Sequence, residues 1–326
     1  MVNTYTRQAG QIQKRTGMLE SQELSRAVWI DMVEPSKEEE VAVEAVLGVE
    51  VPTPEEMREV ESSSQIYREG EAAVMTIRIM NITSSPSPRL TPATFILTPN
   101  RLVTLRYGNP SPFRIFSERL ASQAELLSSP KAAMVGLLET IVDRVADILE
   151  NVGDQLDKLS ECLFTENSKI SSGRPDTSLE ATLQSIGRNG DLASRVRESL
   201  HSIDRVTPTL VRKQDAPLPQ ELSERVATLR RDVKSLLEHD AYLTAKIQFL
   251  LDSNLGLISI QQNAIIKIFS VAAVIFLPPT LVASIYGMNF EHIPELKWLY
   301  GYPFALTMMV ISSVVPYWYF KRRRWL

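Results

Sequence analysis

Residues 268–290 read IFSVAAVIFLPPTLVASIYGMNF, and residues 298–320 read WLYGYPFALTMMVISSVVPYWYF. Each stretch is 23 residues long and contains no Asp, Glu, Lys or Arg. A helix that crosses a bilayer needs about 20 predominantly apolar residues, at about 1.5 Å of rise per residue. A pair of buried helices in a soluble core is disfavoured, because soluble helices usually carry charge on one face. The sequence therefore predicts two membrane-spanning helices, at 268–290 and 298–320.

The basic residues orient this predicted hairpin. Lys321-Arg322-Arg323-Arg324 follows the second span directly, whereas the loop 291–297 carries two acids and one lysine. By the positive-inside rule the C-terminal tail, 321–326, lies in the cytoplasm and the loop lies outside. Two spans return residues 1–267 to the cytoplasm, and the polar N-terminus shows no signal peptide. We expect a multi-pass protein of the cell inner membrane with both termini cytoplasmic.

The overall composition averages unlike regions. The 326 residues have a net charge of −4 and a mean hydropathy of −0.07, but residues 1–267 alone hold 37 acidic and 30 basic side chains, a net charge of −7. Cys162 is the single cysteine, which excludes a disulfide or a cysteine metal cluster within one chain. The three histidines lie too far apart for a metal motif. Without a basic patch in the body, nucleic acid is not an expected partner.

The body before the spans has two predicted parts. Residues 1–110 form a mixed α/β domain, and residues 111–219 form a region of long helices, expected at 113–127, 131–164 and 178–207. The α/β part has strands at 27–32, 73–79, 93–97 and 102–106, a hairpin turn at 99–101 and helix starts at 35–36 and 52–56. Ser36 and Glu39 have capping-box spacing. No phosphate loop, nucleophile elbow or paired catalytic carboxylate is recognisable, so we do not expect an enzyme.

The last soluble helix begins near Gln220 and has no clear stop before the first span. Apolar residues recur at 3-4 spacing from Leu222 to Ile268. An unbroken helix would have about 70 residues and a length of about 105 Å, so that the stalk at 220–267 enters the bilayer directly. Two helices separated by a kink are the alternative.

A second stripe of residues follows the same helix. Its members are Asp252, Ser259, Asn263, Ser270, Leu277 and Ser284, with Thr280 nearby. Positions seven apart drift by only about 20° on a helix, so these residues share one face. Polar groups in hydrocarbon are costly unless they meet another helix or water. The stripe therefore indicates either hydrogen bonds between helices or a pore lining. The prolines at 278 and 279 indicate either a kinked anchor or carbonyls that face water, with Thr280 able to help satisfy the backbone.

A sequence motif stands at the end of the first span, Tyr286-Gly287-Met288-Asn289-Phe290. It resembles the hallmark Gly-Met-Asn of the CorA family of magnesium/cobalt transporters. Further resemblances, in the same order along the chain, lie at 265–270, 276–281, 294–298, 301–303, 319–321 and 325–326. An ordered set over about 60 residues is far more specific than a tripeptide.

The resemblance implies a fold class: an α/β cytoplasmic N-terminal domain, a long-helix stalk and two C-terminal transmembrane helices, assembled as a funnel-shaped homopentameric channel. Gly287, Met288 and Asn289 would form the ion-binding outer mouth. The family's pore positions correspond to Asn263, Leu277 and Thr280, with Asp252 lower on the stalk, and these coincide with the stripe. Ser270 and Ser284 are the further pore-lining predictions. Glu291 and Glu295 would either attract cations to the mouth or belong to a solvated loop.

The implied function is influx of hydrated Mg²⁺, with Co²⁺ and Ni²⁺ as further expected substrates. The expected partners are other copies of the chain, the bilayer and these cations, with no cofactor. The resemblance also implies closure by Mg²⁺ bound at cytoplasmic sites between subunits, with the ligands of the regulatory metal unassigned. One alternative is a proton-coupled zinc transporter of the same superfamily, although that branch typically has Ile where Met288 stands here. Another is a membrane-anchored oligomeric metal sensor that conducts nothing.

Overall fold

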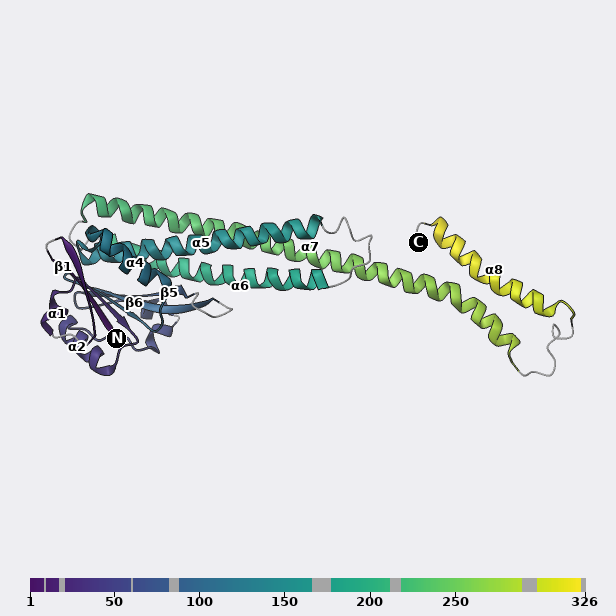
Figure 1. Ribbon diagram of the computed structural model, residues 1–326, viewed down its shortest axis with the longest axis horizontal. Helices are drawn as coiled ribbons and strands as arrows, with labels where there is room; N and C mark the ends of the chain where they lie inside the picture. The colour runs from purple at the N-terminus through teal and green to yellow at the C-terminus, as the bar shows by residue number, and fades with distance from the viewer. Residues whose placement is uncertain are drawn as a thin grey trace. The chain divides into compact units, whose positions relative to one another are not determined.

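The computed structural model describes residues 1–8, 10–17, 21–59, 61–81, 88–165, 177–211, 218–288 and 298–323. Two compact units divide the chain, Met1–Leu250 and Leu251–Leu326. The elements (Figure 1) are β1 Val2–Gln8, β2 Gln11–Thr16, α1 Ser21–Arg26, β3 Trp29–Val33, α2 Lys37–Leu47, η1 Glu56–Arg58, α3 Ser62–Gln65, β4 Ile66–Glu69, β5 Ala72–Asn81, β6 Arg89–Leu97, β7 Leu102–Arg106, α4 Ser111–Ser122, η2 Ala124–Leu127, α5 Pro130–Thr165, α6 Thr177–Val206, η4 Thr207–Val211, α7 Gln220–Tyr286 and α8 Gly301–Arg322.

The N-terminal domain is built on a seven-stranded sheet in the order β2-β1-β3-β7-β6-β5-β4. The β3–β7 pair is parallel, with Asp31 opposite Thr104, and the other neighbours are antiparallel. Side chains alternate between the two faces of a strand. Ile30 and Met32 of β3 therefore pack into the cluster that includes Leu24 of α1 and Val43 of α2. Helices α1 and α2 therefore cover one face of the sheet, and its central strands are buried.

The opposite face of the sheet packs on α4 through aromatic side chains. Trp29 lies 5.3 Å from the ring of Phe116, and Phe95 lies 6.5 Å from the ring of Phe113, measured between centroids. Tyr5 of β1 stacks on Trp29 at 4.2 Å. This packing makes β1 a strand even though its sequence, VNTYTRQ, has little apolar character.

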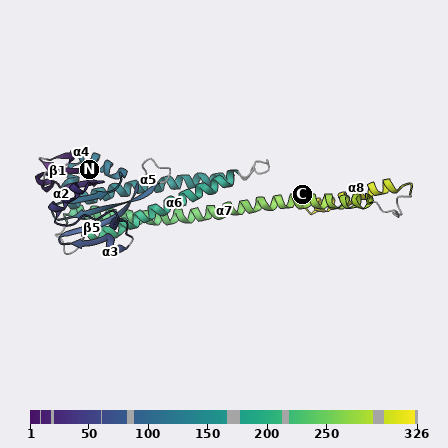
Figure 2. The same cartoon turned by 90° about the horizontal axis from the view of Figure 1, so that it is seen from below.

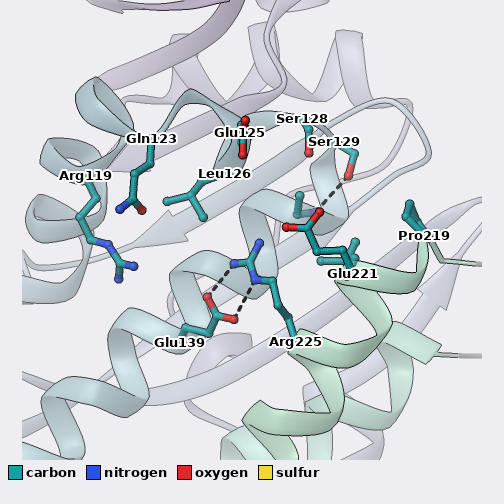
Figure 3. Close-up of a pocket in the computed structure, with 12 residues that line it drawn as sticks. Arg119, Gln123, Glu125, Leu126, Ser128, Ser129, Glu139, Pro219, Glu221 and Arg225 are labelled. Atoms are coloured by element: carbon teal, nitrogen blue, oxygen red, sulfur yellow. Dashed lines mark hydrogen bonds and ion pairs between the residues drawn. The ribbon is translucent and has the colours of Figure 1, made fainter.

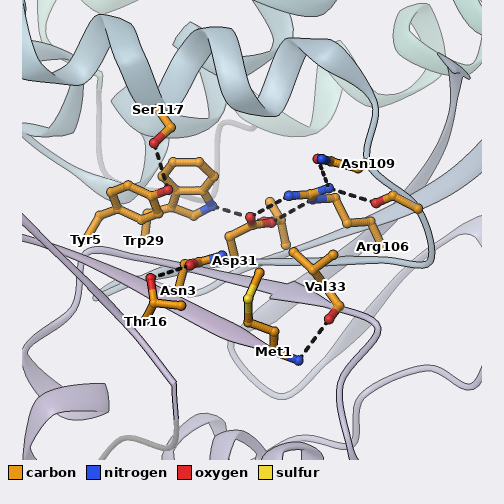
Figure 4. A network of polar contacts seen from close by, with 12 residues as sticks. Met1, Asn3, Tyr5, Thr16, Trp29, Asp31, Val33, Arg106, Asn109 and Ser117 are labelled. Atoms are coloured by element: carbon orange, nitrogen blue, oxygen red, sulfur yellow. Dashed lines mark hydrogen bonds and ion pairs between the residues drawn. The ribbon is translucent and has the colours of Figure 1, made fainter. Parts of the chain in front are cut away.

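A buried ion pair lies on this second face (Figure 4). Arg106 donates from Nε to Oδ1 of Asp31 at 3.0 Å and from Nη2 to Oδ2 at 2.9 Å. Thr104 Oγ1 donates to Asp31 Oδ1 at 2.9 Å and accepts from Trp29 Nε1 at 3.0 Å. The second guanidinium nitrogen of Arg106, Nη1, donates to the carbonyl of Gly108 and to Asn109 Oδ1. The two charges meet in a bidentate pair, which joins β3 to β7 and, through Gly108 and Asn109, to the segment that leads into α4.

Three long helices complete the first unit. α5, α6 and the first part of α7 lie side by side in both views (Figure 1; Figure 2). Their contact faces are apolar, as at Leu149, Val196 and Val233, each of which is fully buried. Gly153 of α5 and Gly190 of α6 both face α7, since a Cβ on either would lie at an ordinary contact distance of 3.7 Å, from Leu243 and Ile247 respectively.

Most of the predicted elements are confirmed. The strands at 27–32, 73–79, 93–97 and 102–106 correspond to β3, β5, β6 and β7, and the turn after β6 forms the predicted hairpin. The capping box of Ser36 and Glu39 is present at α2. α7 is a single helix of 67 residues that contains both prolines, so the unbroken stalk is confirmed and the two-helix alternative is wrong.

Two predictions differ from the structure, and three strands were not predicted. The helix expected at 52–56 is only the single 3-10 turn η1, although Thr53 and Glu56 do make reciprocal cap hydrogen bonds. The helix expected at 113–127 breaks at Gln123, whose extended φ of −129° separates α4 from η2. Strands β1, β2 and β4 are not predicted. β2 and β4 are exposed edge strands without an alternating buried face, and each pairs only with its neighbour in sequence. The mostly polar β1 lies inside the sheet through its pairing with the distant β3. The sequence also predicts a loop at 84–88 and a helix break at 171–175; of these, residues 84–87 and 171–175 lie outside the described residues.

The second unit contains the apolar part of α7 and the helix α8. Both helices are long and apolar enough to cross a membrane, and only 6% of the most apolar stretch of each helix is buried. Val271 of α7 and Ala305 of α8 are buried. The remaining apolar surface is exposed, as at Phe269, Phe276 and Leu281. Helices of this composition leave an apolar surface that water does not solvate well, which is expected of membrane spans.

Candidate functional site: the apolar part of the last long helix

The stripe predicted from the sequence lies on an exposed face of α7. All of its residues are exposed: Asp252, Ser259, Asn263, Ser270, Leu277, Thr280 and Ser284. At 100° per residue, Ser270 and Leu277 lie about 100–120° around the helix from the buried Val271. The stripe is therefore separate from the buried contact of its own chain. Hydrogen bonding to another helix, one of the two readings of this stripe, would need a second copy of the chain.

The two prolines do not interrupt the helix. Lacking an N–H, Pro278 and Pro279 remove the usual donors to the carbonyls of Val274 and Ile275. Thr280 Oγ1 donates to the carbonyl of Phe276 at 2.7 Å, one residue beyond these two. Thr280 was expected to help replace the hydrogen bonds that the prolines remove. Its hydroxyl instead bonds to the carbonyl of Phe276, which neither proline deprives of a donor. Its hydrogen atom is used within the helix, so the oxygen lone pairs are what it can offer to water.

The motif begins in the last turn of α7. The amide of Gly287 donates to the carbonyl of Ala283 at 3.0 Å, and that of Met288 donates to the carbonyl of Ile285 at 3.3 Å. A Cβ on Gly287 would lie 3.2 Å from the carbonyl oxygen of Ala283, a tight contact. The side chain of Met288 is 49% exposed. Asn289, Glu291 and Glu295 lie outside the described residues.

α7 is fastened to the bundle by ion pairs that the sequence analysis missed. Near its start, Arg225 donates to both carboxylate oxygens of Glu139 on α5, at 3.0 and 2.6 Å (Figure 3). Further along, Lys246 Nζ lies 2.5 Å from Asp157 Oδ1 of α5. The Arg225–Glu139 pair lines a cavity of about 550 Å³ together with residues that include Arg119 and Glu221. Because both basic and acidic side chains line this cavity, its charge does not indicate one class of ligand.

The third attachment is the least exposed. Asp240 of α7 is fully buried, and its Oδ2 accepts from Nε of Arg197 on α6 at 2.6 Å. Its other oxygen, Oδ1, makes no hydrogen bond within the described residues. The signal for this residue was in the sequence: between Leu236 and Leu243 the 3-4 spacing requires an apolar residue at 240, and an acid stands there.

Burial raises the pKa of Asp240, against the opposing effects of Arg197, His201 and His239. When the pKa of an acid is higher in the folded state than in the unfolded state, the free energy of unfolding decreases as the pH rises between the two pKa values. At pH 7 the ionised carboxylate therefore destabilises the folded protein. We expect Asp240→Asn to raise the thermal midpoint at pH 7, and the gain to shrink as the pH falls towards the unfolded pKa. Melting curves of both proteins from pH 4.5 to 8 measure this, with Asp157→Asn as the exposed control. Parallel pH profiles would contradict it.

The described residues give no direct evidence of a regulatory metal site. Within the part of the chain that the structure describes, no three His, Cys, Asp or Glu side chains are grouped closely enough to hold a metal ion. The ligands of a regulatory metal therefore stay unassigned.

A large α/β and helical body followed by two helices long and apolar enough to cross a membrane is the arrangement expected of a membrane protein. The family model of the CorA-like Mg²⁺ transporter proteins matches residues 25–322. The chain is 37% identical over 307 residues to the magnesium transport protein CorA of Salmonella typhimurium, with 94% of each chain covered. The same identity and coverage hold for the magnesium transport protein CorA of Escherichia coli. The chain therefore belongs to the CorA-like Mg²⁺ transporter family.

Solved structures agree with the architecture. The complete CorA magnesium transporter from Methanocaldococcus jannaschii matches with a TM-score of 0.75 at 18% identity, covering 100% of this chain and 99% of that one. This confirms the predicted plan of an α/β domain, a long helix and two apolar C-terminal helices. Membership of a transporter family also bears out the prediction that the protein is not an enzyme.

Proposed function

We propose that this chain assembles as a homopentamer in the inner membrane and conducts hydrated Mg²⁺ into the cytoplasm. The observation that carries the proposal is the exposed polar stripe on an otherwise apolar helix. In lipid, side chains such as Ser270 and Ser284 are costly to expose. Two spans cannot enclose a pore, so several copies must bring their stripes together around water. The relatives named magnesium transport proteins support Mg²⁺ as the transported ion.

The proposed membrane boundaries follow the uncharged stretches. The spans are 268–290 and 298–320, the loop 291–297 is external, and the tail 321–326 is cytoplasmic because it is basic. The α/β domain at 1–110, the long-helix region at 111–219 and the stalk at 220–267 are then all cytoplasmic.

The proposed selectivity filter is the ring of Gly287, Met288 and Asn289. Mg²⁺ gives up its waters reluctantly and prefers oxygen ligands. Neutral amide oxygens of Asn289 would hold the hydrated ion through its water molecules, weakly enough for it to leave. The C-terminal end of α7 lies beside this ring, and its free carbonyls carry partial negative charge. Glu291 and Glu295 would add to the local cation concentration.

The remaining stripe forms the proposed pore wall, with Leu277 as its hydrophobic constriction and Asp252 nearer the cytoplasm. Mg²⁺ bound to the cytoplasmic domains would close the pore, as the resemblance implies. α7 supplies a direct mechanical connection for such gating, because the same helix carries the attachments to α5 and α6 and the stripe. Co²⁺ and Ni²⁺ are proposed as further substrates, since they also occur as hydrated divalent ions.

The test is ion flux into proteoliposomes that contain the purified full-length protein. With an inside-negative potential we expect Mg²⁺ uptake, since a charge of +2 gains about 4.6 kcal/mol per 100 mV. Uptake should not need a pH gradient. Zinc uptake that requires a proton gradient would support the zinc transporter instead. Metal-induced structural change without any flux would support the sensor.

A further inference from the structure

The C-terminal end of α8 carries three consecutive cation–π pairs. Lys321 Nζ lies 5.9 Å from the ring centroid of Tyr317, Arg322 Cζ lies 5.3 Å from that of Trp318, and Arg323 Cζ lies 5.8 Å from that of Tyr319. In each pair the cation is four residues after the ring, which places both on one face of the helix. The three aromatic rings are 45–59% exposed.

These pairs form a collar rather than a patch. Tyr317, Trp318 and Tyr319 are separated by 100° each, so the pairs extend over about 200° of the helix circumference. Helical side chains lean towards the N-terminus, so the cations of residues 321–323 reach back to the level of the rings. Exposed Trp and Tyr at the end of a membrane span lie at the level of the lipid headgroups. The cations are therefore held at that level and not out in the water.

No acidic side chain of the same helix neutralises the collar. The sequence contains no Asp or Glu between Lys297 and its last residue, Leu326. Guanidinium groups bind phosphate oxygens in a bidentate manner, and their stacking on aromatic rings leaves the N–H edges available for that purpose. A cation in this position, surrounded by rings that lie in the interface, matches the phosphate of a lipid.

We propose that the collar binds anionic phospholipid headgroups, with Lys321, Arg322 and Arg323 contacting the phosphates and the three aromatic residues fixing the depth of the cations. The proposal rests on the membrane placement of α8 given above and not on ion conduction. The competing partner for the same cations is the acidic body of another copy of the chain, which has a net charge of −7 over residues 1–267.

Equilibrium binding of fluorescent phosphatidylglycerol to the full-length protein in neutral detergent tests this proposal. We expect unlabelled phosphatidylglycerol to compete, and phosphatidylcholine and inorganic phosphate not to. The variant Lys321→Gln/Arg322→Gln/Arg323→Gln should lose roughly a hundredfold in affinity, because each basic residue near an anionic surface contributes about fivefold. The variant Tyr317→Leu/Trp318→Leu/Tyr319→Leu leaves all the basic residues that orient the helix in the membrane unchanged. Its affinity for the lipid should fall several-fold.

The matched control is Arg230→Gln/Arg231→Gln/Lys234→Gln, which removes two Arg and one Lys from exposed positions of α7 in the first unit. It should bind the lipid as the unaltered protein does. Unchanged affinity in the collar variant would overturn the proposal, as would equal competition by inorganic phosphate. Weakened oligomers of that variant in every lipid alike would assign the cations to another copy of the chain. Mg²⁺ flux measured in phosphatidylcholine vesicles keeps the two proposals separable, since lipid binding and conduction can fail independently.

Discussion

Asn289→Ala is expected to abolish Mg²⁺ uptake into proteoliposomes while the oligomer remains intact. The amide oxygen is the group proposed to meet the hydrated ion, and a methyl group offers it nothing. Because the amides are proposed to act as a ring in the assembly, one substitution would change every copy at once. Asn289 lies outside the described residues, so the oligomeric state of the variant is measured alongside its uptake.

The matched control for this variant is Asn151→Ala. Asn151 is an exposed amide on α5, where it accepts from Gln155. Its removal should leave uptake unchanged. Size-exclusion chromatography in detergent checks that both variants assemble. Normal uptake by an assembled Asn289→Ala protein would refute the proposed filter, and loss of uptake in both variants would show that the effect is not specific to the motif.

Asp31→Ala is expected to have the largest effect on stability. Asp31 and Arg106 are 3% and 6% exposed, so the substitution leaves a buried guanidinium without its counter-charge. Breaking a buried pair on one side costs about 3–5 kcal/mol. For a unit of this size, a loss of that magnitude lowers the thermal midpoint by roughly 10 °C. Trp29 shares the hydrogen-bond network through Thr104, and its fluorescence reports the change locally.

Two further variants test whether the effect comes from the unpaired charge. The double variant Asp31→Leu/Arg106→Met removes both charges and should recover most of the midpoint, since replacing a whole buried pair is often neutral. Asp147→Ala breaks an exposed pair with Arg144, whose contribution is at most about 1 kcal/mol. A midpoint for Asp31→Ala that equals the midpoint of Asp147→Ala would contradict the argument.

Local sequence signals predicted their elements well. The capping box at Ser36 and the hairpin turn after β6 each depend on a few consecutive residues. The continuity of α7 followed from an unbroken 3-4 spacing that could be counted residue by residue. The helix expected to start at 52–56 shows the limit of such signals: the cap formed, but the backbone becomes extended at Glu59, with a ψ of 143°, so the helix ends after a single turn.

The candidate site divides in the same way. Its stripe and its Gly-Met-Asn motif were visible in the sequence as periodicity and as a resemblance. The attachments of α7 were not, because Arg225, Asp240 and Lys246 pair with residues 43 to 89 positions away. Only the break in apolar spacing at Asp240 hinted at one of them.

By itself, the sequence determined that the chain has two apolar spans, a continuous stalk and a basic C-terminal end, because hydropathy, periodicity and charge are properties of contiguous residues. Only the tertiary structure decided that the polar segment at Val2–Gln8 is a strand, that Asp31 meets Arg106 and that Asp240 is buried against Arg197. These features depend on which distant surfaces come together, and that is not encoded in any short stretch of residues.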